Sequence, residues 1–359
     1  MATVFVPKIL AEWALGDIDV INDIPADIGA DISGAINFLM LGTDERQAGP
    51  DSDSLLRSDT IVLVHIPASR DQVYMISFPR DLRVTIPAAP DSGFTGGIEK
   101  INAAFAFGAR DSDGRRDTSS NGRKKGAELA MRTISDIVKD TGGLKFSGWA
   151  TINFEGFDKV VEELGSVKMC FDQDVWSIHY WPDGTPADGS MYNWSNNHGG
   201  ENPKTGFHYP AGECWDMAPW QALDYSRQRV GLPNTDYDRQ RHQQQLLKAI
   251  VAKVASSEVL TNLGTVSRLQ QAAADMLVLN LGNNKVEDWV WTMRNLRSDD
   301  ITMIKTYGGQ FNGEEFNGIW YEGLAPSLVE LLQAVQNDTV FNFLANHQDW
   351  VAADTAVAP

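Results

Sequence analysis

The sequence is short of positive charge. It contains 30 Lys and Arg residues against 48 Asp and Glu residues, which gives a formal net charge of -18. A protein that follows nucleic-acid phosphates needs a broad basic face, so this composition argues against nucleic-acid binding. A small, focused site for an anion remains compatible with it.

Long apolar runs are also missing. No stretch of about 18 apolar residues occurs, so the printed chain offers no candidate membrane span. The opening residues, MATVFVPKILAEWALGDIDV, lack the basic start and the continuous apolar segment of a signal peptide.

Cysteine is scarce, and the familiar catalytic motifs are absent. Cys170 and Cys214 are compatible with one disulfide or with two buried thiols, and their spacing fits no zinc site. There is no G-x-S-x-G, P-loop or H-E-x-x-H motif, and no pair among the 6 His has metal-ligand spacing.

What is present is an alternation of strand-like and helix-like segments, which predicts one contiguous α/β domain. Residues 36–42, 60–66 and 72–78 are β-rich, and the last two should form a hairpin. A turn followed by a strand is expected over 142–154, and further strands at 166–171 and 299–308. Helices are expected at 100–108, 127–140, 155–165, 219–229 and 236–256, then two or three more, with a last helix at 327–337. Residues 110–126 and 172–210 should be loops.

Two carboxylates flank the loop between the first two predicted strands. Asp44 follows one strand, and Asp59 precedes the next. Carboxylates at such positions can share a Mg2+ ion, which also tends to bind substrate phosphate. Asp is equally common as a turn-capping residue, so the pattern alone leaves both interpretations open.

Arginine is concentrated in DYSRQRVGLPNTDYDRQRHQQQ, residues 224–245. One interpretation is a solvated helix surface, with the neighbouring aspartates as partners. The other is a phosphate clamp, because guanidinium binds phosphate in a bidentate manner and keeps its charge. Arg57 and Arg80 raise the same question, since both are flanked by acidic residues.

Taken in order, several segments resemble the LytR-CpsA-Psr (LCP) family of bacterial cell-wall ligases. They are NFLMLGTDER, LLRSDTIVLVHI, ISFPRDLRV, KINAAFAFG, INFEGFDKVVEELGSV and QALDYSRQRVGLPNTDYDRQRHQQQLLKAI. They cover roughly residues 36–255. The sequence departs from the pattern at His242, where many members carry Gln, and we assign that residue no role.

The resemblance implies a three-layer α/β/α fold, with a central mixed β-sheet flanked by helices and an apolar pocket for a prenyl lipid. It places the catalytic domain at residues 35–345, between an N-terminal segment (1–34) and a C-terminal tail (346–359). It implies a phosphotransferase dependent on Mg2+ (or Mn2+) that moves a glycopolymer from a polyprenyl-pyrophosphate carrier onto peptidoglycan. Such a protein acts on the extracytoplasmic face of the membrane, so we expect the printed chain to lack an N-terminal anchor.

The resemblance also implies roles for individual residues. The metal carboxylates correspond to Asp44 and Asp59. The pyrophosphate clamp corresponds to Arg57, Arg80, Arg227, Arg229 and Arg239. Asp81 and Asp236 are alternative general bases, and the other polar positions of the site are Arg46, Lys100 and Gln243.

Three further expectations accompany the resemblance. An extracellular location favours a Cys170–Cys214 disulfide. A hydrolase, in which water replaces the acceptor hydroxyl, is an alternative to the transferase. A non-catalytic module that binds polyprenyl-phosphate lipids is the other alternative.

Overall fold

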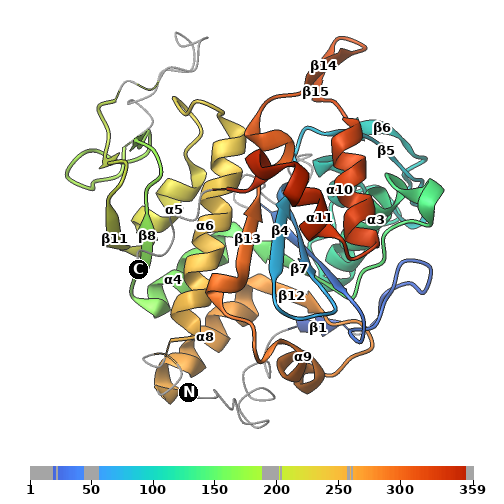
Figure 1. Ribbon diagram of the computed structural model, residues 1–359, viewed down its shortest axis with the longest axis horizontal. Coiled ribbons are helices and arrows are strands. Elements are labelled where there is room, and N and C mark those ends of the chain that lie inside the picture. Colours follow the sequence, from blue (N-terminus) through green and yellow to red (C-terminus); the bar gives the residue numbers. More distant parts are fainter. Residues whose placement is uncertain are drawn as a thin grey trace.

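The computed structural model describes residues 19–21, 23–43, 56–187, 202, 204–256, 259 and 262–352. Its centre is a 7-stranded mixed sheet (Figure 1). The strands, in the order in which they lie side by side, are β1 (Asp19–Ile21), β12 (Leu277–Asn280), β7 (Gly148–Asn153), β2 (Ile36–Thr43), β3 (Ser58–Ile66), β4 (Val73–Ser77) and β13 (Ile301–Ile304). The pairs β2–β3 and β3–β4 are antiparallel, whereas β2–β7 and β4–β13 are parallel.

Helices cover both faces of this sheet. One face carries α2 (Asn102–Gly108), α3 (Ser120–Asp136), α10 (Pro326–Gln336) and α11 (Val340–Asn346), whose apolar side chains share a core with the sheet strands. A second core joins α4 (Phe154–Leu164), α5 (Pro219–Arg227), α6 (Asp236–Val254) and α8 (Leu263–Met276). α9 (Val286–Met293) lies at the end of the sheet near β1 (Figure 1). The predicted α/β fold with a mixed sheet between helices is confirmed, and the prenyl pocket stays a prediction.

The predicted strands β2, β3 and β4 are confirmed, together with the β3–β4 hairpin. Their near-continuous Val, Ile and Leu content follows from burial on both faces. Leu39, Leu63 and Ile76 belong to the core beneath α2 and α3. Val62 and Met75 are also buried, and in pleated strands they point to the opposite face.

A disulfide stabilises residues 167–217, which we call the arm and which lead into the arginine-rich helices α5 and α6. β8 (Val167–Cys170) pairs antiparallel with β11 (Cys214–Met217), and Cys170 lies opposite Cys214 in the register. The two residues form a disulfide, as the resemblance implied. Residues 171–213 between them contain the short pair β9 (Val175–Trp176) and β10 (His208–Tyr209); residues 188–201 and 203 lie outside the described residues.

The prediction of a loop over residues 110–126 is partly wrong, because α3 already begins at Ser120. The Ser119 side chain accepts a hydrogen bond from the Gly122 N–H and so caps the helix. The next turn packs against α2 through glycine rather than through an apolar side chain. A Cβ atom at Gly126 would lie 2.8 Å from the Phe105 carbonyl oxygen. The contact with α2 is therefore too close for a side chain, and no apolar period marks the helix in the sequence.

The structure differs from the prediction at the C-terminal end and at two hairpins. A helix was expected to end the fold at 327–337, but α11 and a turn at Gln348–Trp350 follow it. Two hairpins were not predicted, namely β5 (Arg83–Ile86) with β6 (Gly97–Lys100) and β14 (Gly313–Phe316) with β15 (Ile319–Glu322). β1 pairs within the central sheet and Trp350 is buried. Described residues of both terminal segments thus share the core of the domain.

Short 3-10 helices complete the fold at Pro90–Ser92, Lys139–Thr141, Ser298–Asp300, Thr306–Gly309 and Gln348–Trp350. Within the described residues, no helix combines the length and the apolar character needed to cross a bilayer.

Candidate active site

Asp59, in β3, lies at the centre of a polar cluster built from separate segments. Its Oδ2 accepts a hydrogen bond from Arg80 Nη1 at 2.9 Å, and its Oδ1 accepts one from Asn102 Nδ2 at 2.9 Å. Arg57 Nη1 donates to Asn102 Oδ1 at 3.3 Å. Arg80 follows β4 and Asn102 begins α2, so the antiparallel β3–β4 pair and α2 bring these residues together. Asn102 was not predicted as a site residue.

The first turn of α6 closes the cluster from the opposite side. Arg239 Nη2 lies 2.9 Å from Asp236 Oδ1 and 3.4 Å from the Asp59 carbonyl oxygen. Arg80 Nε lies 3.7 Å from the same Asp236 oxygen. Asp236 therefore sits between two guanidinium groups that the sequence separates widely.

Gln243 connects α6 to β3 through a side-chain hydrogen bond. Its Oε1 accepts a hydrogen bond from the hydroxyl of Thr60, the neighbour of Asp59, at 3.0 Å. Asp236, Arg239 and Gln243 recur at helical spacing and so share one face of α6. The predicted site position of Gln243 thus corresponds to a buried residue that contacts the strand carrying Asp59.

Asp81 and Lys100 form the rim of the cluster. Lys100 Nζ lies 2.9 Å from Asp81 Oδ1, while Arg80 Nε is 3.9 Å from the other Asp81 oxygen. Glu322, in β15, donates its backbone N–H to the Asp81 carbonyl oxygen at 2.9 Å. The rim therefore connects the site to the β14–β15 hairpin.

The charges of this cluster keep one another ionised. Burial alone would raise the pKa of Asp59, but the charge of Arg80, the hydrogen bond from Asn102 and the charge of Arg239 together lower it. Burial opposes the charge of Arg80 as well, yet Asp236, Asp59 and Asp81 raise its pKa above the ordinary value. Burial lowers the pKa of Arg239, but a guanidinium stays charged in proteins.

Several buried polar atoms of the cluster lack a hydrogen-bond partner among the described residues. They are the donors Arg80 Nε and Arg239 Nε, and the acceptor Asp236 Oδ1, which contacts guanidinium nitrogens at 2.9 and 3.7 Å as an ion pair without hydrogen-bond geometry. Buried polar atoms are nearly always satisfied in native proteins, and exceptions indicate a functional site or a missing ligand. Donors of this kind suit the oxygens of a phosphate.

Arg241 does not belong to this site. Its Nε contacts Asp172 Oδ2 at 2.5 Å, and its Nη1 contacts Asp238 Oδ1 at 2.6 Å. Residues two apart on a helix do not face each other, so Arg241 points away from the face that carries Arg239. Arg241 is therefore a largely buried arginine that pairs with two acids instead of facing the site.

Arg227 and Arg229 lie on a segment that a buried polar network holds in place. The helix was expected to continue to Arg229, but α5 ends at Arg227 and Gln228 is extended. Gln228 is fully buried, whereas Arg227 is exposed and Arg229 is half-buried. Both arginines are therefore more accessible than the residue between them.

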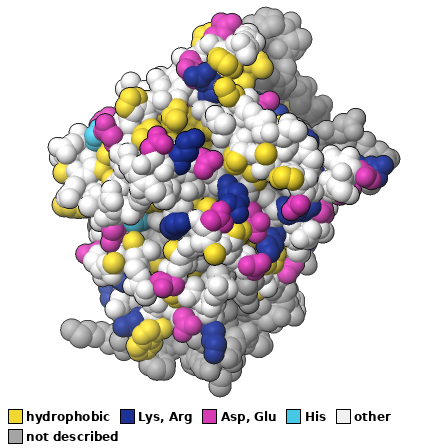
Figure 2. All heavy atoms as spheres, turned by 90° about the vertical axis from the view of Figure 1, so that its right-hand side faces the viewer, with side chains coloured by type: hydrophobic (Ala, Val, Ile, Leu, Met, Phe, Trp, Pro, Cys, Tyr) yellow, Lys and Arg dark blue, Asp and Glu magenta, His cyan; other side chains and the backbone are white. Residues whose placement is uncertain are grey.

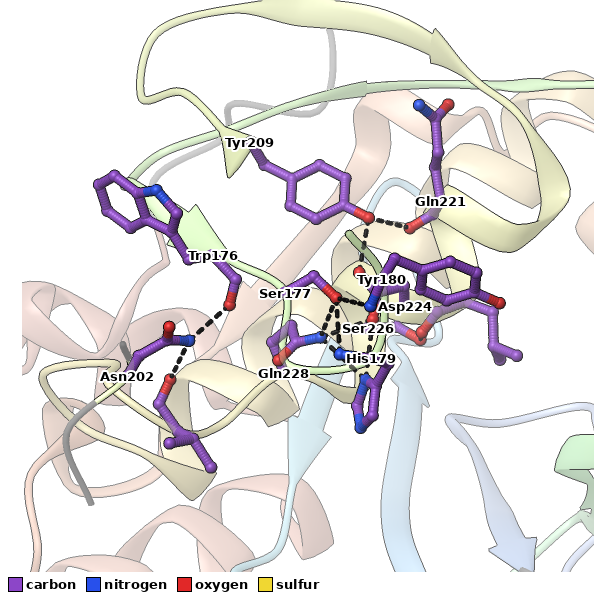
Figure 3. Close-up of polar contacts among 12 residues, drawn as sticks. Trp176, Ser177, His179, Tyr180, Asn202, Tyr209, Gln221, Asp224, Ser226 and Gln228 are labelled. Carbon is purple, nitrogen blue, oxygen red and sulfur yellow. Dashed lines mark hydrogen bonds and ion pairs between the residues drawn. The ribbon is translucent and has the colours of Figure 1, made fainter. Parts of the chain in front are cut away.

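The anchor is a polar network around Asp224 (Figure 3). The buried Asp224 carboxylate accepts hydrogen bonds from Tyr209 Oη at 2.7 Å and from Gln228 Nε2 at 2.5 Å. His179 Nδ1 lies 2.8 Å from the same Asp224 oxygen that Gln228 contacts. A buried carboxylate with this many donors is well satisfied, and it fixes the backbone between the two arginines.

The structure thus brings together Arg57, Asp59, Arg80, Asp81, Lys100, Asp236, Arg239 and Gln243. The charge of Arg229 also acts on Arg239, whereas Arg227 is exposed at the end of α5. Asp44 and Arg46 lie outside the described residues, so their roles stay predictions.

The sequence model of the LytR_cpsA_psr family matches residues 21–337. The chain belongs to the LytR-CpsA-Psr family.

Curated relatives of this LCP chain come from several bacteria. A protein of Oceanobacillus iheyensis named polyisoprenyl-teichoic acid–peptidoglycan teichoic acid transferase TagU is 27% identical over 287 residues, which are 80% of this chain and 70% of that protein. The cell wall biosynthesis protein LcpA of Corynebacterium glutamicum is 25% identical over 292 residues, 75% of this chain and 49% of LcpA.

Solved structures share the fold. The protein gbs0355 of Streptococcus agalactiae has a TM-score of 0.59 at 18% identity and covers 85% of this chain and 88% of its own. A structure described as TagT bound to LI-WTA has a TM-score of 0.54 at 19% identity and covers 90% of this chain and 99% of its own.

The described residues of the LCP chain fit a metal ion only in part. They contain no group of three or more His, Cys, Asp or Glu that could hold a metal. Mg2+ needs fewer protein ligands, because it keeps several waters and binds through one or two carboxylates and substrate phosphate. Asp59 suits that mode, since each of its oxygens accepts one hydrogen bond and keeps a lone pair.

The departure from the family pattern at His242 leads to a prediction about stability. Complete burial and the adjacent Arg241 charge lower the pKa of His242 to about 4, so the folded protein resists protonation there. An unfolded His titrates near 6.5 and takes up its proton first, so stability should fall as the pH drops from 6.5 towards 4. The contribution of His242 to that loss is up to about 3 kcal/mol.

We therefore expect His242→Gln to flatten the acid side of the stability profile. The measurement is the free energy of unfolding in denaturant at neutral pH and at a pH of about 4.5. His347→Gln, in a less buried position, is the control and should keep the wild-type slope. Equal slopes for wild type and His242→Gln would contradict the assignment.

Proposed function

We propose that this LCP domain is a phosphotransferase that moves a glycopolymer from a polyprenyl-diphosphate carrier onto peptidoglycan. The observation that carries the proposal is a cluster of cationic side chains at Asp59: Arg80 contacts its carboxylate and Arg239 its backbone carbonyl. Arg57 contacts Asn102, which also binds the Asp59 carboxylate, and Lys100 pairs with Asp81 at the rim. The name of TagU, a polyisoprenyl-teichoic acid–peptidoglycan transferase, and the TagT structure described as bound to LI-WTA support the same class of donor and acceptor.

The arginines suit a diphosphate because phosphoryl transfer depends mainly on positioning and on neutralising charge. In the step proposed here, the oxygen of an acceptor hydroxyl attacks the phosphorus atom nearer the glycan. The bond from that phosphorus to the bridging oxygen breaks, and polyprenyl phosphate leaves with the electron pair. The glycan keeps one phosphate, which now links it to the acceptor as a phosphodiester.

Charged partners hold the arginines in position before the donor arrives. Arg80 contacts Asp59 and lies close to Asp236, and Asp236 also binds Arg239. An incoming diphosphate would share these guanidinium groups with the carboxylates. A bound Mg2+ (or Mn2+) ion, which we propose is held by Asp59 and Asp44, would supply further neutralisation of the phosphate oxygens.

Exposure favours Asp81 over Asp236 as the group that takes the proton of the acceptor hydroxyl. The Asp81 side chain is 37% exposed, whereas that of Asp236 is 19% exposed and lies between two arginines. A general base must reach the proton that it removes. The Asp81 side chain, at the rim, has the more accessible oxygens.

Purified protein tests the function when it is mixed with Mg2+, a lipid-diphosphate glycan and a peptidoglycan fragment. We expect mass spectrometry to detect the glycan joined to the fragment through a phosphodiester, and Asp81→Asn to slow this product by about 10²-fold while donor binding persists. Free phosphorylated glycan as the main product would instead establish a hydrolase. Donor binding without any turnover would establish a lipid-binding module.

A further inference from the structure

Exposed apolar side chains gather on and beside the β14–β15 hairpin. Trp320 is 66% exposed, Phe311 54% and Ile319 49%, and Leu324 is also exposed. We call these four residues the hairpin patch. Figure 2 shows hydrophobic side chains at the top of the molecule, the end where Figure 1 places β14 and β15. Large exposed apolar patches mark contacts with proteins, membranes or ligands.

The hairpin presents these side chains on a defined scaffold. Asn317 and Gly318, at its tip, have positive φ angles of 52° and 76°, as in the tight turns that join two antiparallel strands. Arg83, on β5, lies over the Phe316 ring at 4.7 Å and pairs with Glu314. These contacts of Arg83 hold the hairpin against the β5–β6 pair. The hairpin projects from the domain (Figure 1).

The hairpin patch is continuous with the rim of the candidate active site. The Glu322 N–H binds the Asp81 carbonyl oxygen at 2.9 Å, and Lys100 Nζ lies 5.9 Å from the Tyr321 ring centre. The Phe311 ring is 5.4 Å from that of Tyr237, the neighbour of Asp236. Apolar side chains therefore border the edge at which the charged residues of the site begin.

We propose that the hairpin patch rests in the interfacial region of a lipid bilayer and turns the active site towards membrane-borne donor. This inference rests on the proposed function, because a polyprenyl donor resides in a membrane. Trp is enriched at membrane–water interfaces, where its ring is apolar and its N–H stays hydrated. Apolar side chains of a peripheral protein enter the boundary between headgroups and acyl chains.

The charges around the hairpin patch decide which kind of membrane contact it makes. Arg83 and Lys100 are each paired with an acid, and Glu315 is exposed on the hairpin itself. Binding to anionic lipids needs unpaired basic residues, which this part of the described surface does not offer. The contact should therefore be apolar, independent of anionic lipid and insensitive to salt.

Flotation with neutral phosphatidylcholine vesicles tests the contact in the 359-residue chain. We expect wild type to bind in low and high salt alike, and Ile319→Ser combined with Trp320→Ser to weaken binding by about tenfold. Phe341→Ser is the matched control, because Phe341 is 73% exposed on α11 and should not affect binding.

Several outcomes would overturn the inference. They are equal binding by the double variant, equal weakening by Phe341→Ser, and wild-type binding that disappears in high salt. Self-association of wild type that the double variant loses in sedimentation velocity would assign the hairpin patch to a second copy of the chain.

A second assay separates this inference from the proposed function. With a water-soluble donor that carries a short prenyl chain, the double variant should transfer glycan at the wild-type rate. With donor embedded in vesicles, its rate should fall by about the same factor as its vesicle binding. If wild type fails with the soluble donor, the proposed function is wrong, and the flotation result still decides the membrane contact.

Discussion

Asp59→Asn should lower the rate of glycopolymer transfer by about 10²- to 10³-fold, the range seen when one charge-stabilising group is removed from an active site. The amide keeps the size of the side chain and can still accept from Asn102. It removes the negative charge that contacts Arg80 at 2.9 Å and that is proposed to bind Mg2+. The variant should therefore lose much of its transfer rate but little of its free energy of unfolding.

Binding experiments distinguish the proposed metal role from a purely structural one. Without Mg2+, Asp59→Asn should bind a lipid diphosphate at least as well as wild type, because the lost carboxylate no longer competes for Arg80. With Mg2+, wild type should gain affinity and the variant should not. Isothermal titration in both conditions measures the difference.

The control for Asp59→Asn is the same exchange at an exposed aspartate. Asp140 lies in the turn Lys139–Thr141, and Asp140→Asn should keep full transfer activity. The Asp59 side chain is 33% exposed, so its ion pair should contribute no more than about 1 kcal/mol to the free energy of unfolding. An Asp59→Asn protein that folds, gains affinity with Mg2+ as wild type does and transfers at the wild-type rate would refute the assignment.

The elements that the sequence predicted best are those that bury continuous apolar side chains. β2, β3 and β4 are such segments. The start of α3 escaped prediction because its second turn packs against α2 through Gly126 and the Phe105 backbone, which leave no apolar pattern. β14 was missed for the opposite reason, since its exposed and half-buried residues alternate without an apolar face. The local pattern of apolar residues therefore reveals neither glycine–backbone packing nor an exposed hairpin strand.

The site shows a similar division between local and tertiary information. Helical spacing already separates Arg239 from Arg241, because residues two apart face different sides of α6. The partner of each arginine could not be derived in that way, since Asp59 and Asp172 come from distant strands and loops. Asn102 was overlooked because a polar residue beside a predicted helix start resembles an ordinary cap residue. Only the packing of α2 against β3 gives it the contact with Asp59.

The disulfide gives the prediction with the largest effect on stability. Cys170 and Cys214 are separated by 44 residues, and closing a loop of that length in the unfolded chain corresponds to about 4 kcal/mol in the chain-entropy model. We expect the double variant Cys170→Ser, Cys214→Ser to lose roughly that free energy of unfolding in non-reducing denaturant titrations. Wild type with reductant should lose a similar amount, whereas reductant should not change the double variant. Unchanged stability in the double variant would show that the β8–β11 pairing holds the arm without the bond.

The same variant should impair transfer beyond its effect on folding. β11 runs from Cys214 to Met217 and leads directly into α5, which ends at Arg227. The centre of the Phe171 ring lies 4.9 Å from that of Trp215 and 5.2 Å from that of Tyr225. Because Phe171 follows Cys170 directly, the disulfide lies beside the aromatic packing that supports α5. With the disulfide removed, the segment carrying Arg227 and Arg229 should sample more positions, because the covalent restraint on the β8–β11 pair that leads into α5 is lost. We therefore expect weaker binding of a lipid diphosphate at a temperature where the variant is still folded. Wild-type affinity under those conditions would show that the hydrogen bonds of Asp224 suffice to hold the arginine segment.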